Sequence, residues 1–332
     1  MTTESVTVKR PLRFKLNPND FILEVILVLI FVFLAFTAKG FLSADNMFNI
    51  LRNASMAGII AFGMTLVIIA GEIDLSVGSA IAFYGCLCAV MVRDLTALHY
   101  PVIPVVLFSM AVCLILGIVS GMFTGWLRDR FSVPTFITTL ALMAALRGGA
   151  YLLTGSFPVR SFPEWYFFFG GGYVFGVIPF QAVVLLAVFG IMYFVSKYTT
   201  FGRAVYAVGG NAESARLSGI NVRKTRMKVM ALTGFLAAIS GLIVSAQIQS
   251  GNPLVASGQE LNVISACIIG GVSLMGGKGR IWGTFIGVVF LNVLLNGMTL
   301  LNIDEYWQYV AKAVLILVAV LIYQSQEGKQ RN

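Results

Sequence analysis

Residues that commonly perform catalysis are scarce in this sequence. The 332-residue chain has one histidine, His99, and no convincing set of a nucleophile and a base in one plane. A phosphate-binding loop needs Gly, four residues and then Gly-Lys-Ser/Thr, whereas the segment from Gly271 to Lys278 has one residue too many. The cysteines, which lie inside apolar runs without partners at metal-ligand spacing, are Cys86, Cys88, Cys113 and Cys267. We therefore expect no disulfide, metal site, catalytic residue or nucleotide cofactor on this chain.

Five ionisable residues fall within or beside apolar runs, where a charge is costly and often functional. Glu24 lies near the end of its apolar run and can reach water. Lys312 lies about two turns into the last apolar run, and its long side chain can extend to water. Both residues are therefore expected to be structural. Arg147 lies deeper, and it either pairs with a carboxylate or polar carbonyls or faces a wet cavity. Glu72 and Asp74 lie at a break between two runs, where Asp74 is expected to cap the helix that follows.

The elements that carry these residues belong to a strongly apolar chain. Hydrophobic residues make up 58% of it and charged residues 11%, whereas a soluble domain carries roughly 25% charged residues. Because a membrane span needs about 20 apolar residues, the sequence predicts an all-α polytopic membrane protein of about ten helices, some short or broken, with one membrane domain at residues 21–323. The expected spans are residues 21–38, 54–70, 77–92, 103–127, 135–154, 179–196, 227–248, 261–274, 281–300 and 306–323.

Two of the expected spans are weak. Residues 77–92 follow the preceding span after a very short link, and residues 261–274 form a short run that ends in Gly276, Gly277 and Gly279. Either segment is a candidate for a broken or re-entrant helix, in which the glycines let the helix end and the chain turn.

The basic charge of the chain is explained by its orientation in a membrane. The formal net charge is +9, and cytoplasmic loops of membrane proteins carry an excess of Lys and Arg. With the N-terminus inside, 17 of the 23 Lys and Arg residues fall on the cytoplasmic side and four on the outside. The sequence thus predicts cytoplasmic tails at residues 1–20 and 324–332, and a nucleic-acid partner loses its main support.

Small residues recur at four-residue spacing, as in Gly117, Gly121 and Gly125, and as in Gly283 and Gly287. Such faces permit close contact between helices in lipid. Packing within the chain explains most of them without a dimer.

The longest cytoplasmic segment, residues 197–226, contains a pattern for a short helix. Asn211 can cap the helix, Glu213 in its first turn complements the helix dipole, and Gly219 can end it in a left-handed conformation. Two interpretations remain open at this point. The helix is either a compact knob that a soluble partner grips or an amphipathic helix that rests on the bilayer, although its small residues offer little apolar area.

An aromatic-rich segment lies on the predicted outer side, at residues 155–176. Aromatic residues of this density are typical of an anchor at the membrane interface. The alternative is a docking surface for an external protein.

Three stretches resemble the permease subunits of bacterial ABC sugar importers of the ribose, arabinose, xylose and galactoside class. Residues 63–79 are similar to the signature between the second and third spans of that family. Residues 201–220 resemble its cytoplasmic coupling segment, with one departure, Ser214, where the family has Ala. Residues 258–279 are similar to its C-terminal block, which continues to residues 306–309.

The resemblance implies a homodimeric channel in the bacterial inner membrane that has no enzymatic activity of its own. A cytoplasmic ABC ATPase, with two nucleotide-binding halves in one polypeptide, would bind ATP and Mg, and a periplasmic binding protein would deliver a pentose or hexose. Residues implied to couple to the ATPase are Asn211, Ala212, Glu213, Ser214, Ala215, Arg216 and Gly219. Residues of the gating or structural motif are Gly71, Asp74, Ser76, Gly78, Gly276, Gly277 and Gly279.

Neutral amides are suited to a sugar path because they can hydrogen-bond hydroxyl groups without holding a substrate tightly. The candidates for such a path are Gln247, Asn262, Asn292 and Asn296. The alternative function is a secondary transporter of a small polar solute driven by an ion gradient, because that class shares the spans, the broken helices and the absence of catalytic motifs.

Overall fold

The computed structural model describes residues 21–331, and the predicted tail at residues 1–20 lies outside this range. The first half of the described chain contains α1 (Ile22–Thr37), α2 (Ala44–Ile69), α3 (Val77–Ala97), α4 (Val102–Phe131) and α5 (Thr135–Thr154). After a 3₁₀ turn (Glu164–Tyr166) come α6 (Phe167–Gly171), β1 (Tyr173–Val174), β2 (Ile178–Pro179), α7 (Phe180–Tyr198), α8 (Thr200–Gly210) and α9 (Ala212–Leu217). The remaining helices are α10 (Val222–Ile248), α11 (Gln259–Ile269), α12 (Ile281–Leu300) and α13 (Glu305–Arg331).

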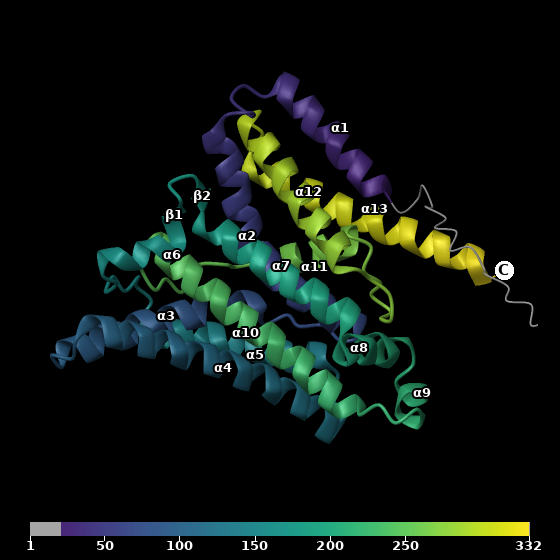
Figure 1. The fold of residues 1–332 in the computed structure, drawn as a ribbon, viewed down its shortest axis with the longest axis horizontal. Helices are drawn as coiled ribbons and strands as arrows, with labels where there is room; N and C mark the ends of the chain where they lie inside the picture. Colours follow the sequence, from purple (N-terminus) through teal and green to yellow (C-terminus); the bar gives the residue numbers. More distant parts are fainter. Residues whose placement is uncertain (1–20, 332) are drawn as a thin grey trace, which may run out of the picture.

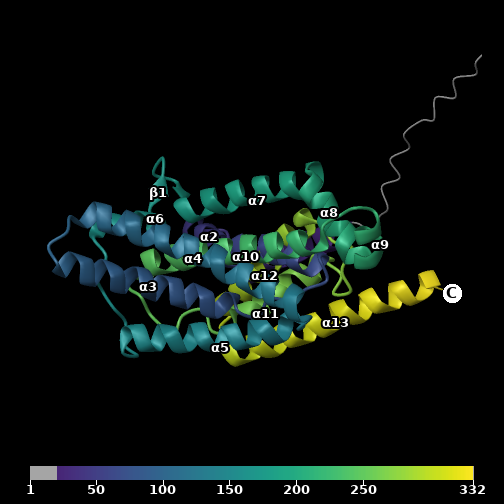
Figure 2. The same ribbon diagram turned by 90° about the horizontal axis from the view of Figure 1, so that it is seen from below.

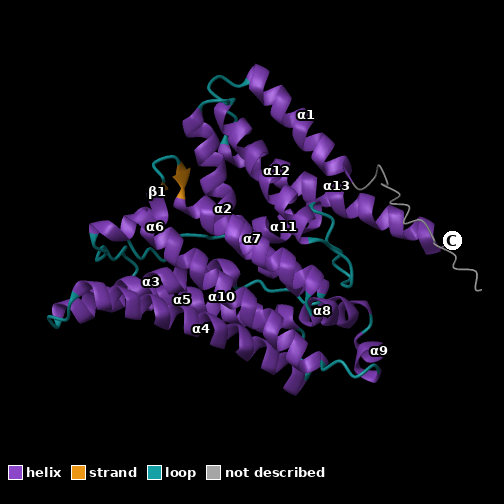
Figure 3. Cartoon of the chain, viewed as in Figure 1, coloured by secondary structure: helices purple, strands orange, loops and turns teal. Residues whose placement is uncertain are grey.

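The described chain is almost entirely helical, as predicted (Figure 3). Within it, seven helices are long and apolar enough to cross a membrane: α2, α3, α4, α5, α7, α10 and α12. α3, which looked weak in the sequence, has 21 residues and is one of these seven. α11 has only 11 residues and ends at Ile269, with Gly270 as its cap, after which Gly271 takes a positive φ of 82°. The total of about ten spans stays a prediction.

α2 and α10 form the centre of the molecule. Of the most apolar 18-residue window of each helix, 83% is buried in α2 and 78% in α10, compared with 28% in α4 and 11% in α5. α3, α4 and α10 pack together on one side of α2, whereas α7, α11 and α12 contact α2 from the other (Figures 1 and 2). α4 and α5 thus expose much of their apolar surface, as expected of helices that span a membrane.

The glycines at four-residue spacing allow close contacts between helices of the same chain. A Cβ atom added to Gly121 of α4 would overlap the carbonyl oxygen of Met230 in α10, and one added to Gly234 would overlap the carbonyl oxygen of Gly117. Gly283 makes the same kind of contact with Gly270. The small-residue pattern therefore lets helix backbones touch inside one chain, as predicted.

Arg147 pairs with backbone carbonyls, which confirms one of its two expected interpretations. Its Nη1 donates to the carbonyl oxygens of Pro253, at 2.6 Å, and Val255, at 2.9 Å, in the segment between α10 and α11. A charged side chain thus pairs with carbonyl groups of a segment that turns between two helices.

The aromatic segment at residues 155–176 is more than an anchor at the membrane interface. Phe157 and Phe175 are exposed, but Tyr166 is fully buried, with its hydroxyl donating to the carbonyl oxygen of Leu242 at 3.1 Å. Phe162 stacks on the Tyr166 ring at 4.2 Å. The anchor interpretation is therefore wrong for Tyr166, because the segment folds back onto α10 and places this ring in the core.

Candidate functional site

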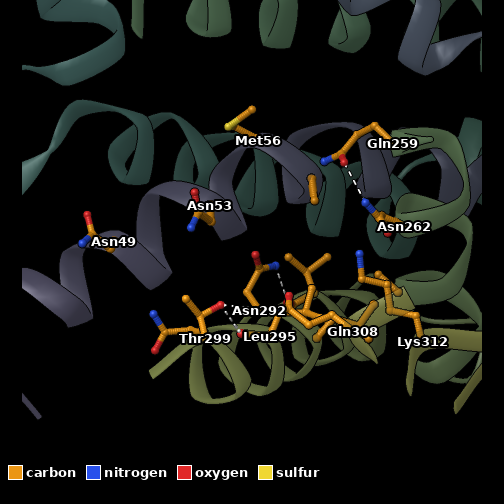
Figure 4. A pocket seen from close by; sticks show the side chains of 15 residues that line it. Asn49, Asn53, Met56, Gln259, Asn262, Asn292, Leu295, Thr299, Gln308 and Lys312 are labelled. Atoms are coloured by element: carbon orange, nitrogen blue, oxygen red, sulfur yellow. Dashed lines mark hydrogen bonds between the residues drawn. The ribbon is translucent and has the colours of Figure 1, made fainter. Parts of the chain in front are cut away.

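A cavity of about 470 Å³ lies between α2, α11, α12 and α13 (Figure 4). Its volume falls within the range of small-molecule sites, which is roughly 300–1,000 Å³. Its apolar lining includes Met56, Ala266 and Val288. Its polar lining consists of Asn49, Asn53, Gln259, Asn262, Asn292, Asn296, Thr299, Gln308 and Lys312.

Hydrogen bonds fix the orientation of several of these amides. Nδ2 of Asn292 donates to the carbonyl oxygen of Val288 at 2.8 Å, and Nδ2 of Asn262 donates to Oε1 of Gln259 at 2.9 Å. Asn296 and Asn46 exchange two hydrogen bonds of 3.0 and 2.7 Å, which tie α12 to α2. The cavity wall thus presents oriented neutral donors and acceptors, which suit a ligand rich in hydroxyl groups.

The structure brings together three of the four residues predicted for the path. Asn262, Asn292 and Asn296 line the cavity, whereas Gln247 lies outside it near the end of α10. Lys312 also lines the cavity, a position that the sequence did not predict, and its structural role stays a prediction. Helix α13 places the Lys312 side chain on the same face as that of Gln308, which lies one turn earlier.

Six of the nine polar lining residues were not predicted as part of the path, although the sequence contains a signal for several of them. Asn49 and Asn53 are four residues apart on α2, as are Asn292 and Asn296 on α12 and Gln308 and Lys312 on α13. Residues at this spacing share one face of a helix. Pairs of polar residues at four-residue spacing inside apolar runs therefore mark the helix faces that surround the cavity.

Three glycine-containing segments meet close to the cavity helices, at the end of α2, at the end of α8 and in the loop at residues 276–279. We call this contact the glycine junction. The amide of Gly277 donates to the carbonyl oxygen of Ile69 at 2.8 Å. A Cβ atom on Gly209 would overlap that same carbonyl, and one on Gly276 would lie 3.1 Å from the Cα atom of Gly71. Gly71, Gly276 and Gly277 also have φ values between 74° and 81°, so no other residue type fits without strain.

Gly279, the last glycine of the predicted motif, joins the same junction. A Cβ atom there would lie 3.0 Å from the side chain of Ile69. Its carbonyl oxygen accepts a hydrogen bond of 2.8 Å from the hydroxyl of Tyr206 on α8. Gly279 therefore ties α8 to the start of α12, which begins two residues later.

The short helix predicted from the sequence is present as α9. Oδ1 of Asn211 accepts from the amide of Ser214 at 2.8 Å, and Gly219 takes a positive φ of 83° after the last turn. Arg216 forms an ion pair of 2.6 Å with Glu213, and this charge-assisted hydrogen bond holds the pKa of the Glu213 carboxyl below its ordinary value. Local capping chemistry thus folds the helix as expected.

α9 lies at the surface, toward the same end of the molecule as the end of α13 (Figures 1 and 2). Ala215 is its buried residue and faces the protein, while Leu217, Glu213 and Arg216 are exposed. The preceding segment, predicted only as part of a loop, forms the helix α8, whose last residues build the glycine junction. α9 is therefore connected directly to the junction through Gly210 and Asn211.

Asp74 does not cap a helix, and that prediction is wrong. α3 begins at Val77 with Ser76 as its N-terminal cap, and Oδ1 of Asp74 accepts from the amide of Ser76 at 2.8 Å and from its hydroxyl at 2.6 Å. Asp74 therefore closes a turn before the helix. Gly78, in the first turn of α3, allows close approach of α11, because a Cβ atom there would overlap Oε2 of Glu260.

Glu72 is the centre of a partly buried charge cluster at the end of α2. Its carboxylate lies 2.8 Å from Arg226 of α10 and 3.2 Å from Arg128 of α4, and it accepts a hydrogen bond of 2.8 Å from Thr135 of α5. Only 5% of the Glu72 side chain is exposed. One carboxylate thus joins the link between α2 and α3 to three other helices.

Comparisons with known proteins identify the family. The family model described as "Branched-chain amino acid transport system / permease component" matches residues 46–319. The ribose import permease protein RbsC of Haemophilus influenzae is 41% identical over 313 residues, which cover 93% of each chain. The xylose transport system permease protein XylH of the same organism is 34% identical over 382 residues, which cover 95% of this chain and 100% of the relative. The chain belongs to the permease family of ABC sugar importers.

This membership makes the permease a multi-pass protein of the inner membrane. A probable ABC transporter permease, YphD of Escherichia coli K12, is a further relative, 40% identical over 306 residues that cover 91% of this chain and 89% of the relative. No solved structure gives a significant match. The three sequence motifs therefore predicted the family correctly, whereas the roles assigned to single residues stay predictions.

We expect Glu72→Gln to lower the free energy of unfolding of the permease by roughly 3 kcal/mol, because it leaves two arginines in a partly buried cluster without their counter-charge. Denaturant unfolding in detergent micelles measures this change. Asp94→Asn is the matched control, since it removes the exposed ion pair of 2.7 Å with Arg93, and such surface pairs contribute about 1 kcal/mol or less. Equal losses in both variants would contradict the role assigned to Glu72.

Proposed function

We propose that this permease forms the channel through which a monosaccharide, a pentose or a hexose, enters the cell. The observation that carries the proposal is the amide-lined cavity of about 470 Å³ between α2, α11, α12 and α13. Relatives along nearly the whole chain bear names that refer to import of ribose and transport of xylose. Neutral amides such as Asn262, Asn292 and Asn296 bind hydroxyl groups and release them again, which transport requires.

In this proposal, the energy for uptake comes from ATP hydrolysis by a cytoplasmic ABC ATPase that binds α9. The helix is short, capped at both ends and placed at the surface of the molecule, with the Glu213–Arg216 pair on its exposed face. ATP and Mg bind to the ATPase, whose two nucleotide-binding halves belong to one polypeptide, and the permease carries no cofactor. The coupling set is Asn211, Ala212, Glu213, Ser214, Ala215, Arg216 and Gly219.

The proposed orientation places α9 and both ends of the described chain on the cytoplasmic side. The start of α1, the end of α13, α8 and α9 lie toward the same end of the molecule (Figures 1 and 2). The opposite end carries α6 and the β1–β2 hairpin, whose turn holds the exposed ring of Phe175. A periplasmic sugar-binding protein docks at this opposite end, and two copies of the permease, of about ten spans each, form the complete channel.

The comparisons do not favour an ion-gradient transporter, which was the alternative from the sequence. Coupling in an ABC importer requires that the ATPase and the binding protein stabilise different states of the channel. In this proposal the ATPase acts on the channel by binding α9, and the glycine junction connects α9 to the helices that line the cavity.

A double change on α9 tests the ATPase partner. We expect the variant with Glu213→Arg and Gly219→Val to lose the ATPase on purification in mild detergent from the native host, because it reverses an exposed charge and places a β-branched residue at a φ of 83°. Mass spectrometry of the co-purified proteins provides the measurement.

Ser214→Ala is the matched control on the same helix, and we expect it to retain the ATPase because it keeps both caps of α9. A double variant that still retains the ATPase, or a wild-type chain that arrives alone and takes up sugar in liposomes without ATP, would contradict the proposed partner.

A substitution in the cavity tests the path itself. We expect Asn292→Leu to reduce ATP-dependent uptake of the transported sugar by about 10-fold, since a sugar hydroxyl left without its partner in the cavity costs roughly 1–3 kcal/mol. The ATPase is expected to co-purify as with the wild type. Uptake in proteoliposomes with the ATPase and the binding protein measures this effect. Gln247→Leu, outside the cavity, serves as the control. An unchanged uptake in Asn292→Leu, or an equal loss in Gln247→Leu, would place the path elsewhere.

A further inference from the structure

A second cavity, of about 890 Å³, opens between the ends of α7 and α8 and the start of α12. It shares none of its lining with the cavity of the proposed path. Its walls combine the aromatic residues Phe189, Tyr193 and Trp282 with the basic residues Lys197, Arg203 and Arg280. We call it the basic–aromatic cleft.

The aromatic wall of the cleft is continuous. The ring of Phe189 lies 5.9 Å from that of Tyr193 and 6.1 Å from that of Trp282, measured between centroids. Trp282 is 43% exposed and donates its Nε1 hydrogen to Oε1 of Glu24 at 3.1 Å. Large, partly exposed rings with a polar group at their edge are typical of positions where acyl chains meet lipid headgroups.

The basic rim lies directly beside this wall. Nζ of Lys197 donates to the hydroxyl of Tyr193 at 3.0 Å and lies 5.3 Å from the centroid of the same ring. Arg203, on α8, lies across the cleft from α7. Within residues 21–331, neither Lys197 nor Arg203 forms an ion pair with a carboxylate. The cleft therefore offers positive charge at the edge of an apolar wall.

We propose that the basic–aromatic cleft binds an anionic phospholipid. Its phosphate contacts Lys197 and Arg203, and its acyl chains lie against Phe189 and Trp282. A ligand that is anionic at one end and apolar along its length matches the cleft in both respects. By composition, residues 1–20 match a basic rim less well than an anionic lipid does, because they carry four basic and two acidic side chains.

Native mass spectrometry of the full chain in mild detergent tests this proposal. The chain is titrated with phosphatidylglycerol, which is anionic, and in parallel with phosphatidylethanolamine, which is zwitterionic. We expect preferential retention of phosphatidylglycerol by the wild type. The variant with Lys197→Gln and Arg203→Gln is expected to bind it roughly 25-fold more weakly, since each basic residue near anionic lipid contributes about a factor of five.

The control variant, with Lys224→Gln and Lys228→Gln, removes two exposed charges from α10 outside the cleft, and we expect it to bind phosphatidylglycerol like the wild type. Equal retention of the two lipids by the wild type, or unchanged retention in the cleft variant, would overturn the proposal. Displacement of the lipid by millimolar inorganic phosphate would also overturn it, as would a cleft variant that changes only the oligomeric mass. None of these measurements depends on sugar uptake or on the ATPase, so they succeed or fail separately from the proposed function.

Discussion

The architecture depends on a backbone contact that only glycine permits. At the glycine junction the last carbonyl of α2, at Ile69, receives the amide of Gly277 and lies against Gly209 of α8. A single side-chain carbon on Gly209 would occupy the position of that carbonyl oxygen. Three segments that are far apart in the sequence are thus held together by main-chain atoms, which are stiffer than side chains that can change rotamer.

The junction explains how a short cytoplasmic helix reaches a cavity inside the membrane. α9 follows directly on the α8 residues of the junction, α2 runs from Ile69 back to Asn53 and Asn49 in the cavity wall, and the loop after Gly279 leads into α12 with Asn292. The charge cluster of Glu72, which immediately follows, links the same point to α4 and α10. In our proposal, a force on α9 therefore moves the helices that line the path.

Features set by neighbours in the sequence could be predicted, whereas features set by distant contacts could not. The caps of α9 at Asn211 and Gly219 depend on residues within two turns, and the structure confirms both. The position of Lys312 in the cavity depends on how α13 packs against α11, and a single sequence does not contain that information. Asp74 was misplaced for a related reason: the α2–α3 link holds an extra turn before Ser76, which the hydrophobic pattern does not reveal.

The most direct test of the junction compares two adjacent glycines, because a Cβ atom on Gly209 would overlap Ile69 while one on Gly210 would meet no atom within 4 Å. The measurement is ATP-dependent sugar uptake by Gly209→Ala and Gly210→Ala in proteoliposomes, together with the amount of ATPase that each variant retains. The account predicts that Gly210→Ala transports like the wild type, whereas Gly209→Ala retains the ATPase but loses most of its uptake. Equal uptake by the two variants would contradict it.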